Sequence, residues 1–359
     1  MIDFLIIGGG IAGISAAARL SHLGGVTVLE AEHGLGYHAS GRSAAMFEET
    51  YGRPSTIALN RASKAYHRDA NGGVLRDRGL MLVGTNGNED AFAHDLATMA
   101  MHPIPVAEAC AMVPILDPAR VTQAGYHAEA WDIDTDLLIQ NFAREARGNG
   151  GTIQLNARVT NIHRTATGWT VDTSAGRHDA KLLINAAGAW ADHIAHLAGV
   201  APVRLQPYRR SMARLPAPGD HDVATWPMLF GPGETWYAKP DAGKLLVSPA
   251  DEDPVEPHDA WADDMILAEG LARYEAHVTE PVTRVETSWA GLRTFAPDRQ
   301  LVIGFAPDDP QFFWLAGQGG YGMQTSPAAS QLAADLVAGR PSGLAADTVT
   351  QLSPARFVP

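Results

Sequence analysis

The clearest pattern of apolar and polar positions is at the beginning of the chain. Residues 2–7 form an apolar run, residues 8–13 contain four glycines, residues 11–20 are rich in alanine, and residues 26–29 are apolar again before Glu30. Short apolar runs next to glycines predict buried strands, and an alanine-rich segment after a glycine turn predicts a helix. The first thirty residues therefore predict a strand, a turn, a helix and a second strand.

The glycine turn matches the G-x-G-x-x-G fingerprint of dinucleotide-binding proteins in its full context. Gly8 permits the tight turn, Gly10 lets a pyrophosphate approach the helix N-terminus, and Gly13 lets the helix pack on the strand. Glu30 lies 20 residues after Gly10, where it can bond both hydroxyls of an adenosine ribose. An acid at this place disfavours a 2′-phosphate, so we expect a dinucleotide other than NADP.

The periodicity of the remaining chain predicts alternating helices and strands. We expect strands at 79–84, 124–130, 152–155, 159–164, 169–173, 181–185, 234–240 and 312–317, and helices at 55–70, 89–101, 107–114, 136–149, 258–276 and 327–338. Residues 201–290 are rich in proline and in strand-like segments, which indicates a change of domain. We therefore expect an α/β protein. Its discontinuous Rossmann-type domain comprises residues 1–80, 150–200 and 290–359, and an inserted α+β substrate domain on a mixed or antiparallel sheet comprises 81–149 and 201–289.

Two further glycine junctions lie between a predicted strand and a predicted helix. One comprises residues 187–190, and the other, residues 317–322, leads to Ser326 as the expected N-cap and Pro327 as the expected first residue of a helix. Residues 39–45 are almost all small, and Arg42 and Ser43 could donate hydrogen bonds to a pyrophosphate. Three junctions exceed what NAD needs, so we expect one long dinucleotide held along the whole chain.

Charge and cysteine content narrow the possible partners. The chain has 27 Lys and Arg against 40 Asp and Glu, a net charge of −13, which argues against nucleic acid or an anionic membrane as the main partner. The single cysteine, Cys110, excludes an internal disulfide and fits a reducing compartment, and we expect a buried structural thiol. We find neither a signal peptide nor an apolar run long enough to span a membrane. We expect a cytoplasmic protein without integral membrane contact, and peripheral membrane association stays open.

Three acids at alternate positions, Asp132, Asp134 and Asp136, precede the predicted helix 136–149. Such spacing could indicate a metal loop, but the glycine and the terminal glutamate of a calcium loop are missing. Acids at this place also cap a helix and interact favourably with its dipole. We therefore expect a helix N-cap and no metal.

Several strings of the chain resemble the flavin-dependent amino-acid oxidase and dehydrogenase family. The resemblance spans nearly the full length and includes residues 6–13, 41–45, 185–190, 289–293 and 319–322. Within this family the chain is most similar to bacterial D-arginine dehydrogenases, through residues 37–43, 133–136, 205–211, 237–243, 253–256 and 318–326. The resemblance implies non-covalent FAD. It also implies oxidation of a free amino acid by hydride transfer to flavin N5, which gives an imino acid and then a 2-oxo acid and ammonia.

The resemblance also implies roles for individual residues. Arg210 and Arg293 match the arginines that hold the substrate carboxylate, Tyr51 and Tyr237 match tyrosines around the substrate, and Gly320 with Tyr321 matches the loop beside the flavin. Cofactor contacts are implied for Gly8, Gly10, Ile11, Ala12, Gly13, Glu30, Ala31, Ser40, Gly41, Arg42, Ser43, Ala44, Ala45, Met46, Arg158, Val159, Ala187, Gly188, Trp190, Gly291, Arg293, Gly317, Gly319, Gly320, Tyr321, Gly322 and Met323.

Two departures from the D-arginine dehydrogenase pattern concern the substrate side chain. Met46 stands where that enzyme has a histidine, and Leu80 stands at the acid that pairs with the substrate guanidinium. An apolar residue cannot compensate a buried cation, so we expect a neutral or hydrophobic amino acid, most plausibly the D-enantiomer. Glu48 or Glu49 could supply a charge from a new position, so a basic substrate is disfavoured and not excluded.

Three alternative functions stay open at this stage. A flavin enzyme for a secondary amine, such as sarcosine or a proline-like acid, would share the fold and the carboxylate site. A flavin protein acting on RNA should show a basic face, which the net charge disfavours. A nicotinamide dehydrogenase would not need the later glycine junctions. The stereochemistry of the substrate and the electron acceptor, whether a quinone, another electron carrier or oxygen, also stay open.

Overall fold

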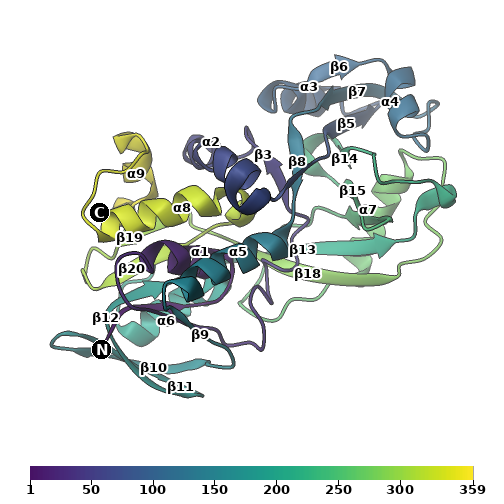
Figure 1. Ribbon diagram of the computed structural model, residues 1–359. Coiled ribbons are helices and arrows are strands. Elements are labelled where there is room, and N and C mark those ends of the chain that lie inside the picture. The colour runs from purple at the N-terminus through teal and green to yellow at the C-terminus, as the bar shows by residue number, and fades with distance from the viewer. Residues whose placement is uncertain (359) are drawn as a thin grey trace.

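The computed structural model describes residues 1–358 and contains two large sheets at opposite ends of an elongated molecule (Figure 1). The first sheet has eight strands: β1 (Ile2–Ile7), β2 (Val26–Leu29), β9 (Thr152–Gln154), β10 (Val159–Thr165), β11 (Gly168–Thr173), β12 (Gly176–Asn185), β19 (Val302–Phe305) and β20 (Phe312–Ala316). Strands β9, β2, β1, β12 and β20 are paired in this order and run parallel to one another, as expected for a Rossmann-type sheet, whereas β10, β11 and β19 join it by antiparallel pairs. The N-terminus and helix α9 (Ala346–Leu352) both lie at this end.

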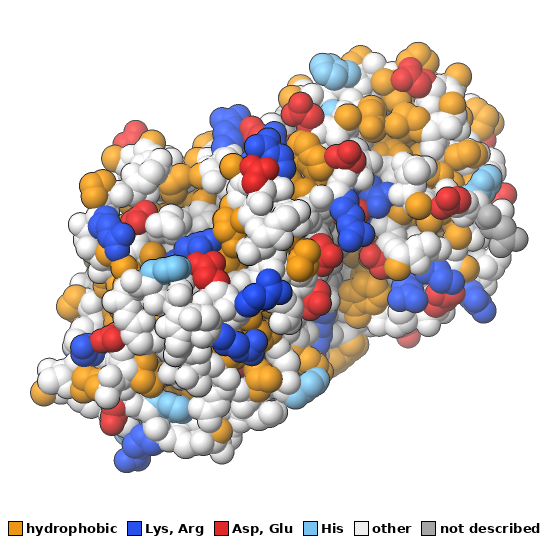
Figure 2. All heavy atoms as spheres, in the orientation of Figure 1, with side chains coloured by type: hydrophobic (Ala, Val, Ile, Leu, Met, Phe, Trp, Pro, Cys, Tyr) orange, Lys and Arg blue, Asp and Glu red, His pale blue; other side chains and the backbone are white. Residues whose placement is uncertain are grey.

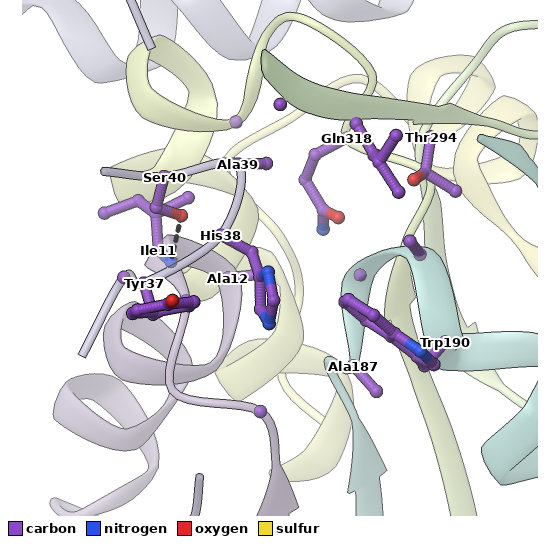
Figure 3. A pocket seen from close by; sticks show the side chains of 18 of the residues that line it. Ile11, Ala12, Tyr37, His38, Ala39, Ser40, Ala187, Trp190, Thr294 and Gln318 are labelled. Atoms are coloured by element: carbon purple, nitrogen blue, oxygen red, sulfur yellow. Dashed lines mark hydrogen bonds between the residues drawn. The ribbon is translucent and has the colours of Figure 1, made fainter. Parts of the chain in front are cut away.

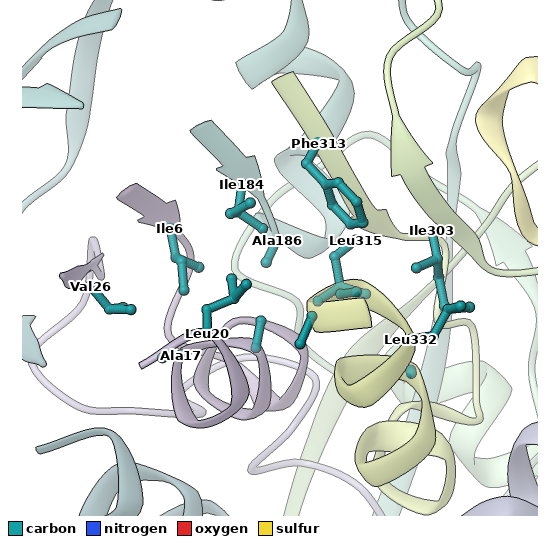
Figure 4. Close-up of a cluster of buried hydrophobic side chains, with 14 of the residues drawn as sticks. Ile6, Ala17, Leu20, Val26, Ile184, Ala186, Ile303, Phe313, Leu315 and Leu332 are labelled. Carbon is teal, nitrogen blue, oxygen red and sulfur yellow. The ribbon is translucent and has the colours of Figure 1, made fainter. Parts of the chain in front are cut away.

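Both faces of the first sheet are covered, which explains why β1 is apolar at nearly every position. Ile6 packs with helices α1 (Ile11–Leu20) and α8 (Gly322–Val337) in one cluster, where Leu20 and Leu332 also lie (Figure 4). Leu5 and Ile7 point to the other face, toward helix α6 (Ala191–Ala198). Alternate residues of a strand point to opposite faces, so a strand covered on both sides needs no polar positions.

The second sheet has nine strands, and all of its pairs except β5 with β14 are antiparallel. The strands are β5 (Leu80–Thr85), β6 (His102–Ile104), β7 (Val121–His127), β13 (Gln206–Leu215), β14 (Met228–Phe230), β15 (Tyr237–Asp241), β16 (Lys244–Ser248), β17 (Asp253–Pro254) and β18 (Thr287–Phe295). The expected combination of a Rossmann-type sheet with a mixed, mainly antiparallel one is confirmed.

A small third sheet and five further helices complete the described fold. The sheet comprises β3 (Met46–Glu48), β4 (Leu75–Asp77) and β8 (Ala130–Ile133), and the helices are α2 (Pro54–Asp69), α3 (Glu89–Thr98), α4 (Val106–Met112), α5 (Thr135–Gly148) and α7 (Asp264–Glu275). Among them α3, α4 and α7 pack on the second sheet. Helix α5 packs against α1 of the first sheet, although it falls within the segment 81–149 that we expect in the substrate domain. The domain boundaries themselves stay a prediction.

The start of α8 corrects a prediction. The helix begins at Gly322, five residues before Pro327, which lies inside it. A proline inside a helix cannot donate to the carbonyl four residues earlier, here that of Met323. The hydroxyl of Ser326 donates to this carbonyl instead, at 3.0 Å, so Ser326 compensates for the proline and does not cap the helix.

Two other boundaries also differ from expectation. Helix α7 begins at Asp264 and not at residue 258, because the carboxylate of Asp263 accepts hydrogen bonds from the amides of Met265 and Ile266 and caps the helix there. Strand β15 begins at Tyr237 and not at residue 234, because residues 232–234 form a 3₁₀ turn with positive φ at Gly233 and Glu234. The expected cap of α5 is confirmed, since the Asp134 carboxylate accepts from the amide of Leu137 at 3.0 Å.

Candidate active site

The larger cavity lies at the carboxyl ends of β1, β2 and β12, where ligands bind in open α/β sheets. Its volume is about 450 Å³, and its walls come from the glycine loop after β1, residues 36–44, residues 186–190 and residues 318–323. The three glycine junctions of the sequence thus meet in one space, although they are far apart along the chain.

The glycine loop has the backbone geometry that its sequence predicts. Gly8 has φ +106°, and a Cβ there would lie 2.4 Å from the carbonyl oxygen of Ala186. A Cβ at Gly13 would lie 1.9 Å from the carbonyl oxygen of Gly8, so Gly13 serves helix–strand packing and does not face the cavity. At Gly10 only the Ser40 hydroxyl lies within 4 Å of such a Cβ, which leaves the backbone open to the cavity.

Polar groups surround this loop. The carboxylate of Glu30 accepts hydrogen bonds from the amides of Gly9 at 2.6 Å and Glu32 at 2.8 Å, and it borders the cavity. The hydroxyl of Ser40 accepts from the amide of Ile11 at 2.9 Å, across the opening of α1 (Figure 3). These two bonds do not exhaust the carboxylate, because each of its oxygens can accept more than one hydrogen bond. A bond between Glu30 and a ribose is therefore still possible and stays a prediction.

The opposite wall suits a flat, polar ligand. The rings of His38 and Trp190 meet with centroids 4.7 Å apart, and Gln318 lies across from them (Figure 3). The Gln318 side-chain nitrogen is buried and has no hydrogen-bond partner within residues 1–358. Gly188 has φ +56° and open space where a Cβ would stand. A buried donor without a partner and a backbone open to close approach both fit a bound dinucleotide.

Arg42 borders the larger cavity but makes most of its hydrogen bonds within the chain. Its guanidinium donates to the carbonyl oxygens of Tyr37 at 3.2 Å, Ala260 at 2.9 Å and Ala290 at 3.0 Å, and to the carboxylate of Asp259 at 2.5 Å. These bonds tie the loop 36–44 to residues 259–260 and to β18. Four of its five N–H donors are therefore used within the protein, and a contact with the pyrophosphate stays a prediction.

Most of the other expected cofactor residues line the larger cavity, and a few do not. Those that do not are Gly13, Gly41, Ala45, Met46, Gly317 and Tyr321. Ala45 and Met46 line a neighbouring, smaller cavity of about 120 Å³. Gly41 lies behind the wall, since a Cβ there would lie 2.6 Å from the carbonyl oxygen of Gly36. The two cavities share Ser43, Ala44, Tyr237, Arg293, Gly320 and Met323.

The register of two strands brings Arg210 and Arg293 together at the junction of the cavities. In the antiparallel pair β13–β18, Arg210 lies opposite Gly291, two residues before Arg293. Residues two apart on a strand share a face, so both arginines point to the same side as diagonal neighbours. At Gly291 the loop 36–44 covers the strand, since a Cβ there would lie 3.5 Å from Cβ of Arg42 and 3.6 Å from Cα of Ala39. Gly320 lies against the guanidinium of Arg293, since a Cβ there would lie 3.0 Å from Arg293 Cζ.

The two arginines differ in their electrostatic surroundings. Burial lowers the pKa of Arg210, and the charge of Arg293 lowers it further. The Arg210 Nε and Nη1 atoms are buried without a hydrogen bond among the described residues. Burial also acts to lower the pKa of Arg293, but Tyr51, Tyr237 and Glu234 outweigh it and raise that pKa. Both side chains stay charged at neutral pH, so the cavity contains positive charge that the chain only partly compensates.

Two expected tyrosines, Tyr237 and Tyr51, lie near these arginines, and the ring of the third, Tyr321, is tilted by 60° against that of Tyr51. Tyr237 is buried and borders both cavities. The hydroxyl of Tyr51 donates to the carboxylate of Glu234 at 3.2 Å, and its ring centroid is 5.3 Å from that of Tyr321. Burial raises the pKa of both Tyr51 and Tyr321.

The smaller cavity is mainly apolar. Leu80 and Met46, the two departures from the D-arginine dehydrogenase pattern, both line it. The sequence interpretation missed the other members of its wall, namely Met99, Met228, Phe230, Glu234, Trp236 and Gln324. They come from segments whose local pattern indicates only a loop, a strand or a helix, so no signal in the sequence marks them except the string 318–326 that contains Gln324.

Lys239 is a further residue that the sequence interpretation did not single out. Its side chain is 6% exposed, and its ammonium donates to the carbonyl oxygen of Ala44 at 2.5 Å and lies 2.9 Å from the carboxylate of Asp132. Arg78 binds the same carboxylate at 2.6 Å. This network fixes the segment 43–46, which separates the two cavities.

Other expectations concern residues away from the cavities. Cys110 is half-buried, its thiol lies 3.7 Å from the carbonyl oxygen of Leu116, and burial raises its pKa. Within residues 1–358, no group of three or more His, Cys, Asp or Glu side chains is arranged to hold a metal ion. Over the same residues, no helix combines the length and apolarity needed to cross a membrane. On the face shown in Figure 2, cationic and anionic side chains are interspersed.

Comparisons with known proteins place this geometry in a family. The family model described as DAO, FAD dependent oxidoreductase, matches residues 3–336. The chain is 25% identical to FAD-dependent oxidoreductase domain-containing protein 1 of Xenopus laevis, over 93% of this chain and 79% of that protein. It is 24% identical to the N-methyl-L-tryptophan oxidase of Salmonella dublin, over 60% of this chain and 59% of that enzyme.

The fold has a close counterpart among solved structures. The glycine oxidase of Geobacillus kaustophilus superposes with a TM-score of 0.84 at 22% identity, over 99% of both chains. The family match covers most of the chain, and the fold match covers both sheets. The chain therefore belongs to the DAO family of FAD-dependent oxidoreductases and uses FAD as its cofactor.

Proposed function

We propose that this protein oxidises a free amino acid to the imino acid, which water then hydrolyses to a 2-oxo acid and ammonia. The observation that carries the proposal is the pair Arg210 and Arg293 at the junction of the two cavities, with buried Arg210 donors that lack a partner. An unpaired buried cation is costly, and a guanidinium pair matches a carboxylate in shape and charge. A substrate carboxylate would supply the missing partner.

The proposed roles follow from the positions of the side chains. Arg210 and Arg293 would fix the carboxylate, and Tyr237, buried beside them, could add a hydrogen bond. Bound FAD would supply the acceptor for the hydride that leaves Cα. The carbonyl of Gly320, next to the Arg293 guanidinium, would meet the substrate amine. No side-chain base is required if the amine binds in its neutral form, so positioning is the main contribution of the protein.

The same geometry supports FAD in the larger cavity. The glycine loop and Glu30 would hold the ADP half, and residues 187–190 and 318–323 would hold the remainder. We propose that FAD is bound without a covalent bond to the cysteine, because Cys110 packs against the core of the second sheet near Leu116 and lines neither cavity. Arg42 would act on the cofactor indirectly, by holding the loop 36–44.

We propose that the substrate is a D-amino acid whose neutral side chain lies in the smaller cavity. Leu80 and Met46 line it and offer no charge for a guanidinium. Two carboxylates also line it, but Glu48 has His127 Nε2 at 2.8 Å and Glu234 accepts from the hydroxyl of Tyr51 at 3.2 Å. Glu49 cannot supply one, since it pairs with Lys64 at 2.9 Å and Arg61 at 3.2 Å away from this wall. Similarity to D-arginine dehydrogenases thus concerns the cofactor and carboxylate sites and not the substrate side chain.

Anaerobic bleaching of the bound flavin tests the proposal. We expect at least one amino acid from a panel of D- and L-enantiomers to reduce the flavin, with neutral side chains ahead of arginine. Failure of every primary amino acid would refute the proposal. Admission of air after reduction then separates an oxidase, which reoxidises rapidly, from a dehydrogenase that needs a quinone or another carrier.

A secondary amine is the second candidate substrate. The N-methyl-L-tryptophan oxidase similarity favours it, because that name describes a secondary amine with a carboxylate. Sarcosine, proline and N-methyl amino acids therefore belong in the same panel. Reduction by these compounds alone would favour the second candidate and would leave the role of the two arginines unchanged.

A further inference from the structure

We infer that the inner end of the smaller cavity is a recognition subsite for a neutral group that both donates and accepts hydrogen bonds, such as a carboxamide or a hydroxyl on the substrate side chain. The subsite consists of Glu48 and Gln324, and the inference rests on the proposed function only in assigning this cavity to the substrate side chain. It goes beyond the apolar wall, which alone would favour a purely hydrophobic side chain.

The first observation is a buried carboxylate with one oxygen left over. Glu48 is 5% exposed and lies on β3 two residues after Met46, so both side chains point to the same face and line the cavity. Its Oε1 atom accepts from the amide of Thr50 at 3.0 Å and from the hydroxyl of Thr50 at 2.7 Å. These two bonds fix the carboxylate, and its Oε2 atom has no hydrogen bond.

The second observation is a buried amide with one donor left over. Gln324 is 3% exposed and lies in the first turn of α8. Its Oε1 atom accepts from the backbone amide of Glu48 at 3.1 Å, which fixes the orientation of the side-chain amide. The Nε2 atom has no partner among the described residues, and Gln324 lines the cavity beside Glu48. An acceptor and a donor without partners therefore lie on adjoining parts of one wall.

His127 accounts for only part of the Glu48 environment. Its Nε2 atom lies 2.8 Å from Glu48 Oε2, but in an arrangement that leaves both atoms without a hydrogen bond. It lies opposite Leu80 in the pair β5–β7, behind the cavity wall. The Oε2 acceptor stays open to a ligand, and the donor of Gln324 beside it favours a neutral group over a cation, because a guanidinium or ammonium cannot accept a hydrogen bond.

Buried polar atoms without partners are destabilising, and native proteins contain few of them. A carboxamide that donates to Glu48 Oε2 and accepts from Gln324 Nε2 would satisfy both atoms at once. A site with buried hydrogen-bonding groups discriminates strongly against an analogue that lacks them, since binding that analogue leaves the groups unpaired. The cavity should therefore prefer a carboxamide over an apolar group of the same shape.

Two carboxylate ligands that need no oxidation provide the test. The ligand 4-carbamoylbutanoate carries a terminal carboxamide, and 5-methylhexanoate has the same chain length and branching with an apolar end. Binding to the FAD-loaded protein is measured from the change in flavin absorption. We expect the carboxamide ligand to bind roughly tenfold more tightly, as two satisfied hydrogen bonds imply, and this ratio to fall to about one in the variant Gln324→Met.

The matched control is Gln331→Met, the same substitution at an exposed position of the same helix, which should leave the ratio unchanged. If Gln324→Met does not fold, Glu48→Gln is the second variant and should also reduce the ratio. Equal binding of the two ligands to the unaltered protein, or a ratio that both variants leave unchanged, would overturn the inference. Flavin reduction by amino acids is read separately, so a failure of the proposed function is distinguishable from a failure of the subsite.

Discussion

At the scale of single residues, the proposed carboxylate site depends on the two arginines at the junction of the cavities. Their environment differs from that of the other arginines described above, such as Arg42 and Arg78, whose guanidinium groups are occupied by carbonyls and carboxylates of the chain. Arg210 instead keeps two buried nitrogen atoms without partners. Charge-assisted hydrogen bonds to a ligand are therefore still available here.

Replacement of Arg293 should weaken carboxylate binding strongly. Loss of hydrogen bonds to a charged group costs about 1.5–3 kcal/mol, so we expect Arg293→Met to lower the affinity for 5-methylhexanoate by about 10- to 100-fold. Titration of the flavin absorption measures this affinity. Arg340→Met, at an exposed position, is the control and should change nothing. Unaltered affinity in Arg293→Met would contradict the carboxylate role.

Gly320 provides a subtler test of the same site. A Cβ at this position would lie 3.0 Å from Cζ and 3.1 Å from Nε of Arg293, closer than an ordinary contact. The guanidinium would have to move, and so we expect Gly320→Ala to weaken carboxylate binding by about tenfold while FAD stays bound. Gly343→Ala is the control, since it has open space around it. Equal ligand affinities in the two variants would show that the position of the guanidinium is not critical.

At the scale of elements, much of the first sheet follows from local pattern, whereas the site depends on pairings that no local pattern reveals. The strand–turn–helix unit of residues 2–20 is predictable because alternation and glycines act over a few residues. Arg210 and Arg293 meet only through the register of β13 with β18, which joins residues about eighty positions apart. The resemblance to a family indicates both arginines as site residues. That both side chains point to the same face of the sheet follows only from the pairing of the two strands.

The start of α8 shows how a local signal can mislead. Serine followed by proline is typical of an N-cap and a first helical residue, yet the helix begins at Gly322. Because the extra turn carries Met323 and Gln324 into the cavity walls, the late predicted start also concealed Gln324 as a site residue. The position of the neighbouring segments, and not the helix signal, decides where this turn forms.

Ser326 should be needed for the stability of this turn. In Ser326→Ala the buried carbonyl of Met323 loses the hydroxyl that replaces the missing amide of Pro327, which should cost about 1–3 kcal/mol of unfolding free energy. Ser330→Ala is a matched control in the same buried helix, because the carbonyl of Pro327 that Ser330 binds can still accept from the amide four residues later. We expect a smaller loss in the control, measured by denaturant unfolding with saturating FAD. Equal losses would contradict this role of Ser326.

At the scale of the whole molecule, the two sheets are linked through the segment 43–46 and through α8, and both border the two cavities. Lys239 of the second sheet binds the carbonyl of Ala44, and Asp259 binds Arg42 in the loop before it. Helix α2 also packs on α8. There the buried His67 of α2 donates from Nε2 to the carbonyl of Gln324 at 2.9 Å. The stability of the fold and the geometry of the cavities therefore depend on shared contacts.

His67 should make the stability of the molecule depend on pH. Burial lowers its pKa from 6.5 to about 4, and the hydrogen bond to the carbonyl of Gln324 opposes this shift only in part. Between these values the unfolded chain binds a proton that the folded chain does not, so the free energy of unfolding falls as the pH falls from 6.5 to 4. The stabilising contribution is complete above pH 6.5, and about 3 kcal/mol of it is lost by pH 4.

Denaturant unfolding at pH 7.5, 6.0, 5.0 and 4.5 measures this loss, with His67→Gln as the variant, because a glutamine amide can still donate to the carbonyl of Gln324. Other groups contribute to the pH dependence of both proteins, including His277, whose pKa burial also lowers. The free energy of unfolding of the variant minus that of the unaltered protein isolates the contribution of His67. We expect this difference to increase as the pH falls below 6.5, because only the unaltered protein loses stability through His67. Parallel curves would mean that the pKa of His67 is the same in the folded and the unfolded chain, which would contradict the effect of burial.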